Sequence, residues 1–235
     1  MLGEITINGK SSRDFNVYLS DAGVYGMPER DTENISIPGK SGDLIKDNGR
    51  YKNKDMFFPC IIVDNFKENF DAFIGYLLIQ KGYVKIEDSF FPDEFIYAKY
   101  TGEAEPKVKT KGNKGSFNIN FNRKPQRYLK SGNDVIAYTA NGSVYNKYNG
   151  TAKPLVRVYG TGDLAIGEAV ITINSVDTYV DIDCEIQNAF KGSTNCNGNI
   201  TVNSGEFFEL TPGVNNIVKA NTISRVEITP RWWKL

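Results

Sequence analysis

Apolar and polar residues alternate along most of this chain of 235 residues. Phe117, Ile119 and Phe121, for example, are separated by single asparagines. A period of two places successive side chains on opposite faces of a strand, so that one face can be buried in a core. Clusters of Gly, Asn, Asp and Pro interrupt these runs at short intervals and are typical of turns. The pattern therefore predicts a mainly β protein, built as a sandwich or a barrel.

One segment has the period of a helix instead. Its large apolar residues fall at i, i+4, i+7, i+11 and i+12, and they are Phe66, Phe70, Phe73, Leu77 and Leu78. This spacing places them on a single helical face. Asn65 can serve as the N-cap, with Glu68 completing a capping box, and Gly82 is a candidate stop. We expect one substantial helix over residues 65–81, which covers one face of the first sheet.

The chain divides best near residues 124–134, between two strand-rich parts. Charge supports this division, although the 28 basic and 28 acidic residues cancel. Residues 99–130 hold nine basic residues and two acidic ones, whereas residues 161–190 hold six acidic residues and no basic one. We expect an N-terminal domain over residues 1–130 and a C-terminal domain over residues 131–235. The zero net charge argues against a dedicated binder of nucleic acid or of anionic membranes.

The chain contains no histidine. Histidine is the commonest general base and metal ligand near neutral pH. Its absence excludes a Ser-His-Asp or Cys-His nucleophile, and any histidine-ligated zinc or haem, on this chain alone. The three cysteines, Cys60, Cys184 and Cys196, match no CxxC spacing and are expected to be simple core residues. A carboxylate pair, a lysine base or an all-oxygen metal site stays open, but we expect no enzyme, no cofactor and no metal.

Two glycine-containing motifs match nucleotide-binding patterns only in part. Gly-Lys-Ser at 39–41 lacks the glycine that a phosphate-binding loop needs five residues earlier, where Asn34 stands. Gly-Thr-Gly at 160–162 follows a predicted strand, but Ala165 replaces the third glycine of a dinucleotide fingerprint and another strand follows. We interpret this second motif as a hairpin turn.

Asp181, Asp183 and Glu185 could form a catalytic or calcium-binding group of carboxylates. Strand alternation accounts for them more simply, because the apolar residues between them would face the core and the three acids the opposite side. We therefore expect a solvated or subunit-facing acidic stripe. Of the adjacent Trp232 and Trp233, only one can face the core of a terminal strand, and we expect the other to lie in an interface.

Residues 20–55 form a long polar segment rich in Gly, Asp, Asn and Lys. Loops of this length are uncommon in a compact domain and are usually functional or disordered. An arm that packs on a neighbouring subunit is one functional interpretation.

Short motifs follow one another along the whole chain in a characteristic order. Besides the lone helix with Phe70 and Leu77, they are Ile37-Pro-Gly-Lys-Ser-Gly-Asp-Leu44, Asn48-Gly-Arg-Tyr-Lys52, Phe121-Asn-Arg-Lys-Pro-Gln-Arg-Tyr128, Lys153-Pro-Leu155, Tyr159-Gly-Thr-Gly162, Ile182-Asp-Cys-Glu185, Gly205-Glu-Phe-Phe-Glu-Leu210, Pro212-Gly-Val-Asn215 and Arg231-Trp232. In this order and spacing the chain resembles the distal tail proteins (Dit) of long-tailed, non-contractile phages that infect Gram-positive bacteria.

The resemblance implies a fold and a place of action. The fold is an N-terminal β-rich domain with one helix and an extended belt over residues 21–54, followed by a C-terminal galectin-like β-sandwich. The place is the virion, at the distal end of the tail, with the host cytoplasm during assembly. Family members form rings, normally hexamers, that join the tail tube to the baseplate or tip.

The resemblance also implies partners. They are further copies of the chain, the tail tube protein, the tail-associated lysin or hub protein, and the tape measure protein as an additional candidate. DNA would only pass through the lumen of the ring, and no membrane would be involved. No stretch of the chain approaches the roughly 20 apolar residues of a membrane span.

In a ring, one patch of each subunit meets a different patch of the next. We predict that the belt residues Ile35, Ile37, Leu44 and Tyr51 pack on the neighbouring subunit, and that Trp233 contributes to an interface. A second hypothesis pairs the basic tract with the acidic tract. Its residues are Lys107, Lys109, Lys111, Asp181, Asp183 and Glu185.

Two other classes of function remain open. The C-terminal sandwich could be a carbohydrate-binding module that recognises host-cell glycans, although galectins commonly use a histidine beside a stacking Trp and this chain has none. A glycosidase acting through Asp181 and Asp183 would need two carboxylates across a cleft, which nothing in the sequence indicates.

Overall fold

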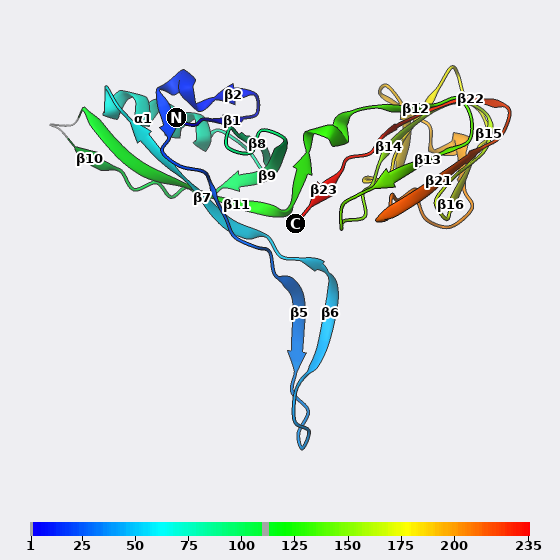
Figure 1. Cartoon of the computed structure of the whole chain (residues 1–235), viewed down its shortest axis with the longest axis horizontal. Coiled ribbons are helices and arrows are strands. Elements are labelled where there is room, and N and C mark those ends of the chain that lie inside the picture. The colour runs from blue at the N-terminus through cyan, green and yellow to red at the C-terminus, as the bar shows by residue number, and fades with distance from the viewer. Residues whose placement is uncertain (1, 110–112) are drawn as a thin grey trace. The chain divides into compact units, whose positions relative to one another are not determined.

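A computed structural model describes residues 2–109 and 113–235 of the chain. The chain divides into two compact units, one formed by Met1–Arg127 with Leu235 and the other by Tyr128–Lys234. Both units consist mainly of strands, and α1 (Phe66–Leu78) is the only α-helix within the described ranges (Figure 1). The predicted fold class, mainly β with one helix, is confirmed. No described helix is long and apolar enough to cross a membrane.

The first unit is organised around one sheet with the strand order β2-β1-β8-β9-β11-β7-β3. Further short strands pair with this sheet, among them β4 with β7 and β10 with β11. The strands are β1 (Ile5–Ile7), β2 (Lys10–Ser11), β3 (Val17–Leu19), β4 (Val24–Tyr25), β7 (Lys54–Ile62), β8 (Val84–Asp88), β9 (Glu94–Tyr100), β10 (Lys107–Lys109) and β11 (Lys114–Leu129), with a 3₁₀ helix at Ser12–Phe15.

Alternate residues of β7 and β11 fill the core of the first unit. Phe117, Ile119 and Phe121 of β11 are buried, and the first two lie opposite Cys60 and Phe58 of β7. The asparagines between them are on the outward face of the sheet, where they are half-buried or exposed. The predicted alternation is therefore confirmed for this strand.

The helix α1 covers this core with part of its apolar face. Phe66, Phe73 and Leu77 are buried in the same cluster as the sheet residues, which confirms the expected packing. Leu78 is exposed, however, so the apolar face is narrower than the sequence spacing suggests.

The helix is also shorter than the predicted range 65–81. Asn65 occupies the N-cap, but its backbone is left-handed with φ 47° and its side chain makes no capping hydrogen bond, so the predicted capping box is wrong. The N–H of Asn65 instead donates to the side chain of Asn113 at 3.0 Å. At the other end, Gln80 donates to the carbonyl oxygens of Leu77 and Tyr76, which satisfies acceptors of the last turn.

The second unit consists of two sheets. One has the order β12-β22-β14-β17-β18-β19 and the other β13-β21-β15-β16-β20. The strands of these sheets are β12 (Ile136–Tyr138), β13 (Gly142–Asn146), β14 (Leu155–Gly160), β15 (Gly162–Ile166), β16 (Ala169–Ile173), β17 (Val180–Asp183), β18 (Asn188–Lys191), β19 (Thr194–Asn195), β20 (Ile200–Val202), β21 (Gly213–Lys219) and β22 (Ile223–Thr229), with 3₁₀ helices at Lys130–Asn133 and Asn197–Asn199. The short strand β23 (Trp233–Lys234) belongs to neither sheet.

These two sheets enclose one hydrophobic core. Val156, Ile182 and Val226 of the six-stranded sheet and Leu164 and Ile217 of the five-stranded sheet are buried in the same cluster. Every second residue of these strands points into the space between the sheets, as the period of two predicts. The second unit is thus a β-sandwich.

The glycine motif at 160–162 does not form the hairpin turn that we predicted. It joins β14 to β15, and these two strands belong to different sheets of the sandwich. Gly160 and Gly162 have φ values of 110° and 115°, which other residues adopt only with strain. A Cβ on Gly160 would lie 2.2 Å from the carbonyl oxygen of Thr222. The glycines are needed because the chain changes sheets while passing close to another backbone segment.

Replacing this glycine tests the crossing directly. We expect Gly160→Ala to lower the free energy of unfolding of the second unit by at least about 2 kcal/mol, from backbone strain and the contact with Thr222. Both tryptophans of the chain lie in this unit, so their fluorescence during urea unfolding reports on it. The control is Gly198→Ala, where the added Cβ meets no atom within 4 Å and the cost should stay within about 0.5 kcal/mol. Equal effects of the two substitutions would contradict this account.

Candidate interface: the arm and its root

Most of the segment over residues 20–55 forms a β-hairpin rather than a polar loop. Its strands are β5 (Arg30–Ile35) and β6 (Leu44–Tyr51), which pair only with each other among the described strands. Figure 1 shows them extending away from the sheet of the first unit as a two-stranded ribbon. We call residues 30–51 the arm. The sequence did not predict these strands because most of their side chains are polar, although Gly39 and Gly42 with positive φ do occupy the turn between them.

Cross-strand ion pairs hold the two strands of the arm together. Arg30 donates to Asp47 through two nitrogens at 3.0 and 2.7 Å, and Lys46 donates to Glu33 at 3.2 Å. Exposed pairs of this kind each contribute at most about 1 kcal/mol. A two-stranded hairpin without further packing is marginally stable in water. The arm therefore gains little stability from its own contacts.

The end of the arm exposes apolar side chains. Ile35 and Leu44 lie directly opposite each other, so they share one face of the hairpin, and they are 43% and 52% exposed. Ile45 is exposed on the other face, and Ile37 is exposed in the turn. Among the predicted arm residues, only Tyr51 is half-buried, because the guanidinium of Arg30 lies over its ring at 5.0 Å from the ring centre. The structure thus brings Ile35 and Leu44 together and places Tyr51 at the other end of the hairpin.

A buried arginine fixes the root of the arm. Arg123 of β11 is 1% exposed, and it donates to the carbonyl oxygens of Lys124, Pro125 and Gly26 at 2.9, 2.8 and 2.7 Å. Its Nε is the one buried side-chain nitrogen or oxygen in the described ranges that lacks a hydrogen-bond partner. Burial lowers the pKa of this guanidinium, and the charge of Arg127 lowers it further. Because Gly26 precedes the arm by only four residues, Arg123 ties the arm's root to the central strand of the sheet.

A second buried polar group holds the chain just before this point. Asp88 accepts hydrogen bonds from the N–H of Gly23 at 3.2 Å and from the hydroxyl of Tyr25 at 3.1 Å. Burial raises the pKa of Tyr25, and the charge of Asp88 and its hydrogen bond raise it further, so the phenol stays protonated and donates. Nothing in the local sequence indicated Arg123 or Asp88 as partners of the segment at 23–26, because the contacts join residues more than 60 positions apart.

The predicted basic residues lie on an edge strand. Lys107 and Lys109 belong to β10, are exposed, and form no ion pair with any residue that the structure describes. Lys111 lies outside the described residues. Lysines on an edge strand also discourage unwanted pairing between sheets. Their charges are nevertheless free to meet an acidic partner.

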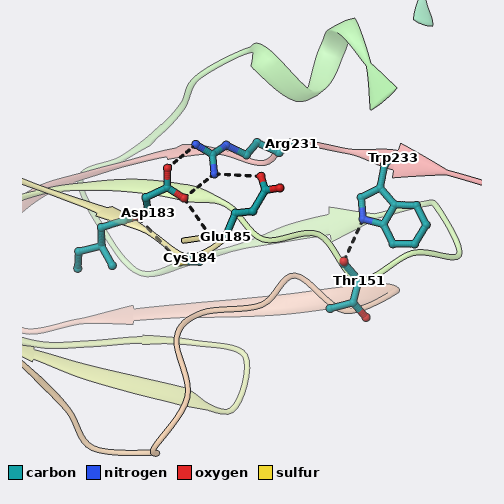
Figure 2. A network of polar contacts seen from close by, with 7 residues as sticks. Thr151, Asp183, Cys184, Glu185, Arg231 and Trp233 are labelled. Carbon is teal, nitrogen blue, oxygen red and sulfur yellow. Dashed lines mark hydrogen bonds and ion pairs between the residues drawn. The ribbon is translucent and has the colours of Figure 1, made fainter. Parts of the chain in front are cut away.

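The predicted acidic stripe is wrong for two of its three residues. Asp181 is buried and binds Arg157 at 2.6 and 2.8 Å. Asp183 is buried and binds Arg231 at 2.7 and 2.8 Å (Figure 2). Arg157 lies directly opposite Asp181 on β14, so the register of the two strands places the charges together. Glu185 alone is exposed, with an oxygen 3.7 Å from Arg231. These two aspartates are therefore neutralised within their own unit.

The surroundings of Asp183 shift the pKa of its carboxyl group. Burial alone would raise the pKa of Asp183, but the hydrogen bonds and charge of Arg231, with the backbone N–H groups of Glu185 and Ile186, hold the pKa below its ordinary value. The carboxylate is thus ionised in the folded protein at neutral pH. A general acid for glycoside hydrolysis needs the opposite shift.

Other acidic residues of the second unit remain free. Glu168 and Glu206 are exposed, line a hollow of about 410 Å³, and form no ion pair with a described residue. Glu209 lines the same hollow, with an oxygen 3.8 Å from Lys153. Glu168 lies within the acidic tract of residues 161–190 but was not among the predicted interface residues. The described residues contain no group of acids, cysteines or histidines that could hold a metal ion.

The two tryptophans are both engaged within the second unit. Trp232 is buried, as predicted for one of them. Trp233 is half-buried, and its indole N–H donates to the carbonyl oxygen of Thr151 at 3.0 Å (Figure 2). A Cβ on Gly150 would lie 2.5 Å from the Trp233 ring, so this ring packs closely on the backbone. Trp233 is therefore a weaker candidate for an interface than the arm is.

The cysteines carry no disulfide. Cys60 and Cys184 are buried free thiols, and Cys196 is half-buried, so two of the three are core residues as predicted. Burial raises the pKa of Cys184 to about 12, which keeps its thiol protonated at neutral pH.

The ion pair between Arg231 and Asp183 predicts that the stability of the fold depends on pH. Because its folded pKa lies below the unfolded value of about 4, Asp183 stabilises the fold above that pH and loses this contribution as the pH falls through the folded pKa. Asp183→Asn should lower the free energy of unfolding by about 2 kcal/mol at pH 7, and this deficit should shrink toward pH 2. Urea unfolding followed by tryptophan fluorescence measures it. The control Asp177→Asn alters an exposed pair with Lys191 and should change little; a deficit that persisted unchanged at low pH would contradict the assignment.

Comparisons with known proteins bear on the fold. No protein family model matches the sequence, and no curated protein matches it either. Among solved structures, the Dit protein of phage SPP1 superposes with a TM-score of 0.76 at 14% identity, covering 97% of this chain and 98% of that one. A chain from the baseplate of phage P2, in its activated conformation with Ca, gives a TM-score of 0.51 at 11% identity and covers 97% of both chains. The resemblance to distal tail proteins is thus confirmed at the level of the fold, and this chain has the Dit fold from end to end.

Proposed function

We propose that this protein is a structural component of a phage tail tip or baseplate. The observation that carries the proposal is the fold match to the SPP1 Dit protein, which extends over nearly the whole of both chains. That protein is described as a paradigm of the hub of the adsorption apparatus in phages that infect Gram-positive bacteria. A shared fold over both units supports a shared architectural role more than a shared single domain would.

In this proposal, copies of the chain form a ring. Each copy offers an arm with an uncovered apolar end, and a closed ring requires a surface of one copy to meet a different surface of the next. We expect six copies around a lumen that passes DNA, between the tail tube and the tail-associated lysin or hub protein, with the tape measure protein as a further contact. The ring would belong to the virion and would assemble in the host cytoplasm.

The proposal includes no catalytic role. Asp181 and Asp183 are each held by an arginine, which removes the one carboxylate pair that the sequence indicated. The carbohydrate-binding alternative also gains no support from the aromatic pair of Tyr159 and Tyr179, because guanidinium groups lie near both rings. We therefore propose assembly as the function and treat glycan binding as the alternative.

Removing the arm tests the ring. The N–H of Lys52 donates to the carbonyl oxygen of Glu29 at 2.8 Å, so an Asn-Gly turn can replace residues 30–51 and leave the root intact. We expect the wild-type protein to form a particle with the mass of several copies by light scattering, and a ring with a central hole in negative-stain images. The variant without the arm should remain folded and monomeric.

A matched control changes the arm without removing its apolar end. The double variant Glu33→Gln with Lys46→Gln breaks only an exposed ion pair, so it should assemble as the wild type does. A ring that persisted without the arm would contradict the role of the arm. A wild-type protein that stayed monomeric at the highest attainable concentration would contradict self-assembly altogether.

The free lysines of β10 make a second, electrostatic prediction. If Lys107 and Lys109 meet the free acids Glu168 and Glu206 of another copy, Lys107→Glu with Lys109→Glu should reduce the assembled fraction several-fold and weaken its salt dependence. Light scattering over a salt series measures both. The control, Lys67→Glu with Lys81→Glu, changes the net charge equally on α1 and just beyond it. If assembly and its salt dependence were unchanged in the β10 variant, the electrostatic hypothesis would be contradicted.

A further inference from the structure

Two adjoining hollows form a groove on the first unit. They have volumes of about 830 and 380 Å³ and share Glu103 and Asn120 in their walls. Their floor is the outward face of the sheet, where Pro59 and Phe57 of β7 lie opposite Asn118 and Asn120 of β11. We call these two hollows together the sheet groove.

The smaller hollow of the sheet groove has apolar walls. Val24 is 50% exposed and pairs with Phe57, so the two side chains form a continuous apolar patch at this end. In a monomer this patch faces solvent. Its apolar chemistry matches that of the end of the arm, where Ile35 and Leu44 share one face.

Charged residues make the match between the end of the arm and the sheet groove more specific. The wall of the sheet groove holds Glu103, Glu105 and Lys107, none of which forms an ion pair with a described residue, so its acids outnumber its base. In the arm, the other cations of both strands are paired, whereas Lys40 in the turn has no carboxylate partner within the described ranges. The free cation thus lies at the tip that also exposes the apolar residues. One docked arm would cover the apolar patch of the groove and bring its free lysine to the unpaired acids.

The arm of the same copy cannot reach this place in its observed conformation. Gly26, at the root of the arm, lines the smaller hollow, and an eight-residue strand such as β6 carries the turn about 26 Å away from the root. Figure 1 shows the arm extended rather than folded back. A segment of this kind that filled the groove would therefore come from another molecule.

We propose that the sheet groove is the receptor for the arm of a second copy of this chain. The inference rests on the proposed ring and adds to it the two surfaces that meet. Ile35 and Leu44 cover Val24 and Phe57, and Lys40 pairs with Glu103 and Glu105. Each copy then donates one arm and receives one, which is the head-to-tail contact that closes a ring.

Charge exchange tests the pairing. Lys40→Glu alone, and Glu103→Lys with Glu105→Lys alone, should each raise the concentration needed for half-assembly about tenfold. All three substitutions together should restore it to within about threefold of the wild type, measured by light scattering. These side chains are exposed, so the variants should fold. Failure of the triple variant to recover, in a protein whose wild type forms a ring, would overturn the receptor site and leave the ring standing.

A direct map of the contact separates the two proposals further. A photo-crosslinking amino acid at position 37, in a mixture of isotopically light and heavy copies, should form light-heavy crosslinks to residues 20–26, 55–60 or 101–107. Crosslinks between copies at other residues would overturn the groove but not the ring. Crosslinks within one copy only, together with a monomeric mass, would overturn both.

Discussion

A buried cation without a carboxylate partner fixes the place from which the arm leaves the molecule. Arg123 binds three carbonyl oxygens, two just beyond it on β11 and one at Gly26, and no acidic side chain is involved. Leaving such buried acceptors unsatisfied costs about 1–3 kcal/mol each. The direction of the arm therefore depends on this one side chain, with Asp88 holding the residues just before it. An arm with a fixed root loses less conformational freedom when its far end docks.

The two units differ in how far their charged and apolar groups are satisfied within one copy of the chain. In the second unit, buried aspartates are matched by arginines and the sandwich core is closed. In the first unit, the apolar end of the arm and the apolar side chains of the sheet groove are exposed to solvent. The lysines of β10 have no acidic partner among the described residues. Exposed apolar patches and unpaired charges that complement one another indicate that further copies of the chain complete the native contacts.

The sequence predicted local structure better than the contacts between distant segments. Alternation around Phe117 and the helical spacing of Phe66 and Phe73 depend on neighbouring residues, and both were confirmed. The exposed acidic stripe and the turn at Gly160 were wrong, because strand register opposes Arg157 to Asp181 and because β14 and β15 belong to different sheets. The arm was anticipated as a segment but not as a hairpin, and Arg123 was not anticipated as its anchor. These features depend on pairing between strands, which a single sequence does not display.

Hydrogen–deuterium exchange of the arm tests the central claim most directly. In the turn over residues 36–43, the one backbone hydrogen bond among the described residues runs from the N–H of Lys40 to the carbonyl oxygen of Ile37, and the outer edges of β5 and β6 pair with no described strand. These amides should therefore exchange rapidly in dilute protein. When the concentration is raised until copies associate, exchange in the arm and in residues 101–107 should slow together, while the core of the second unit stays unchanged. Association that left the exchange of the arm unaltered would contradict the claim that the arm joins one copy to the next.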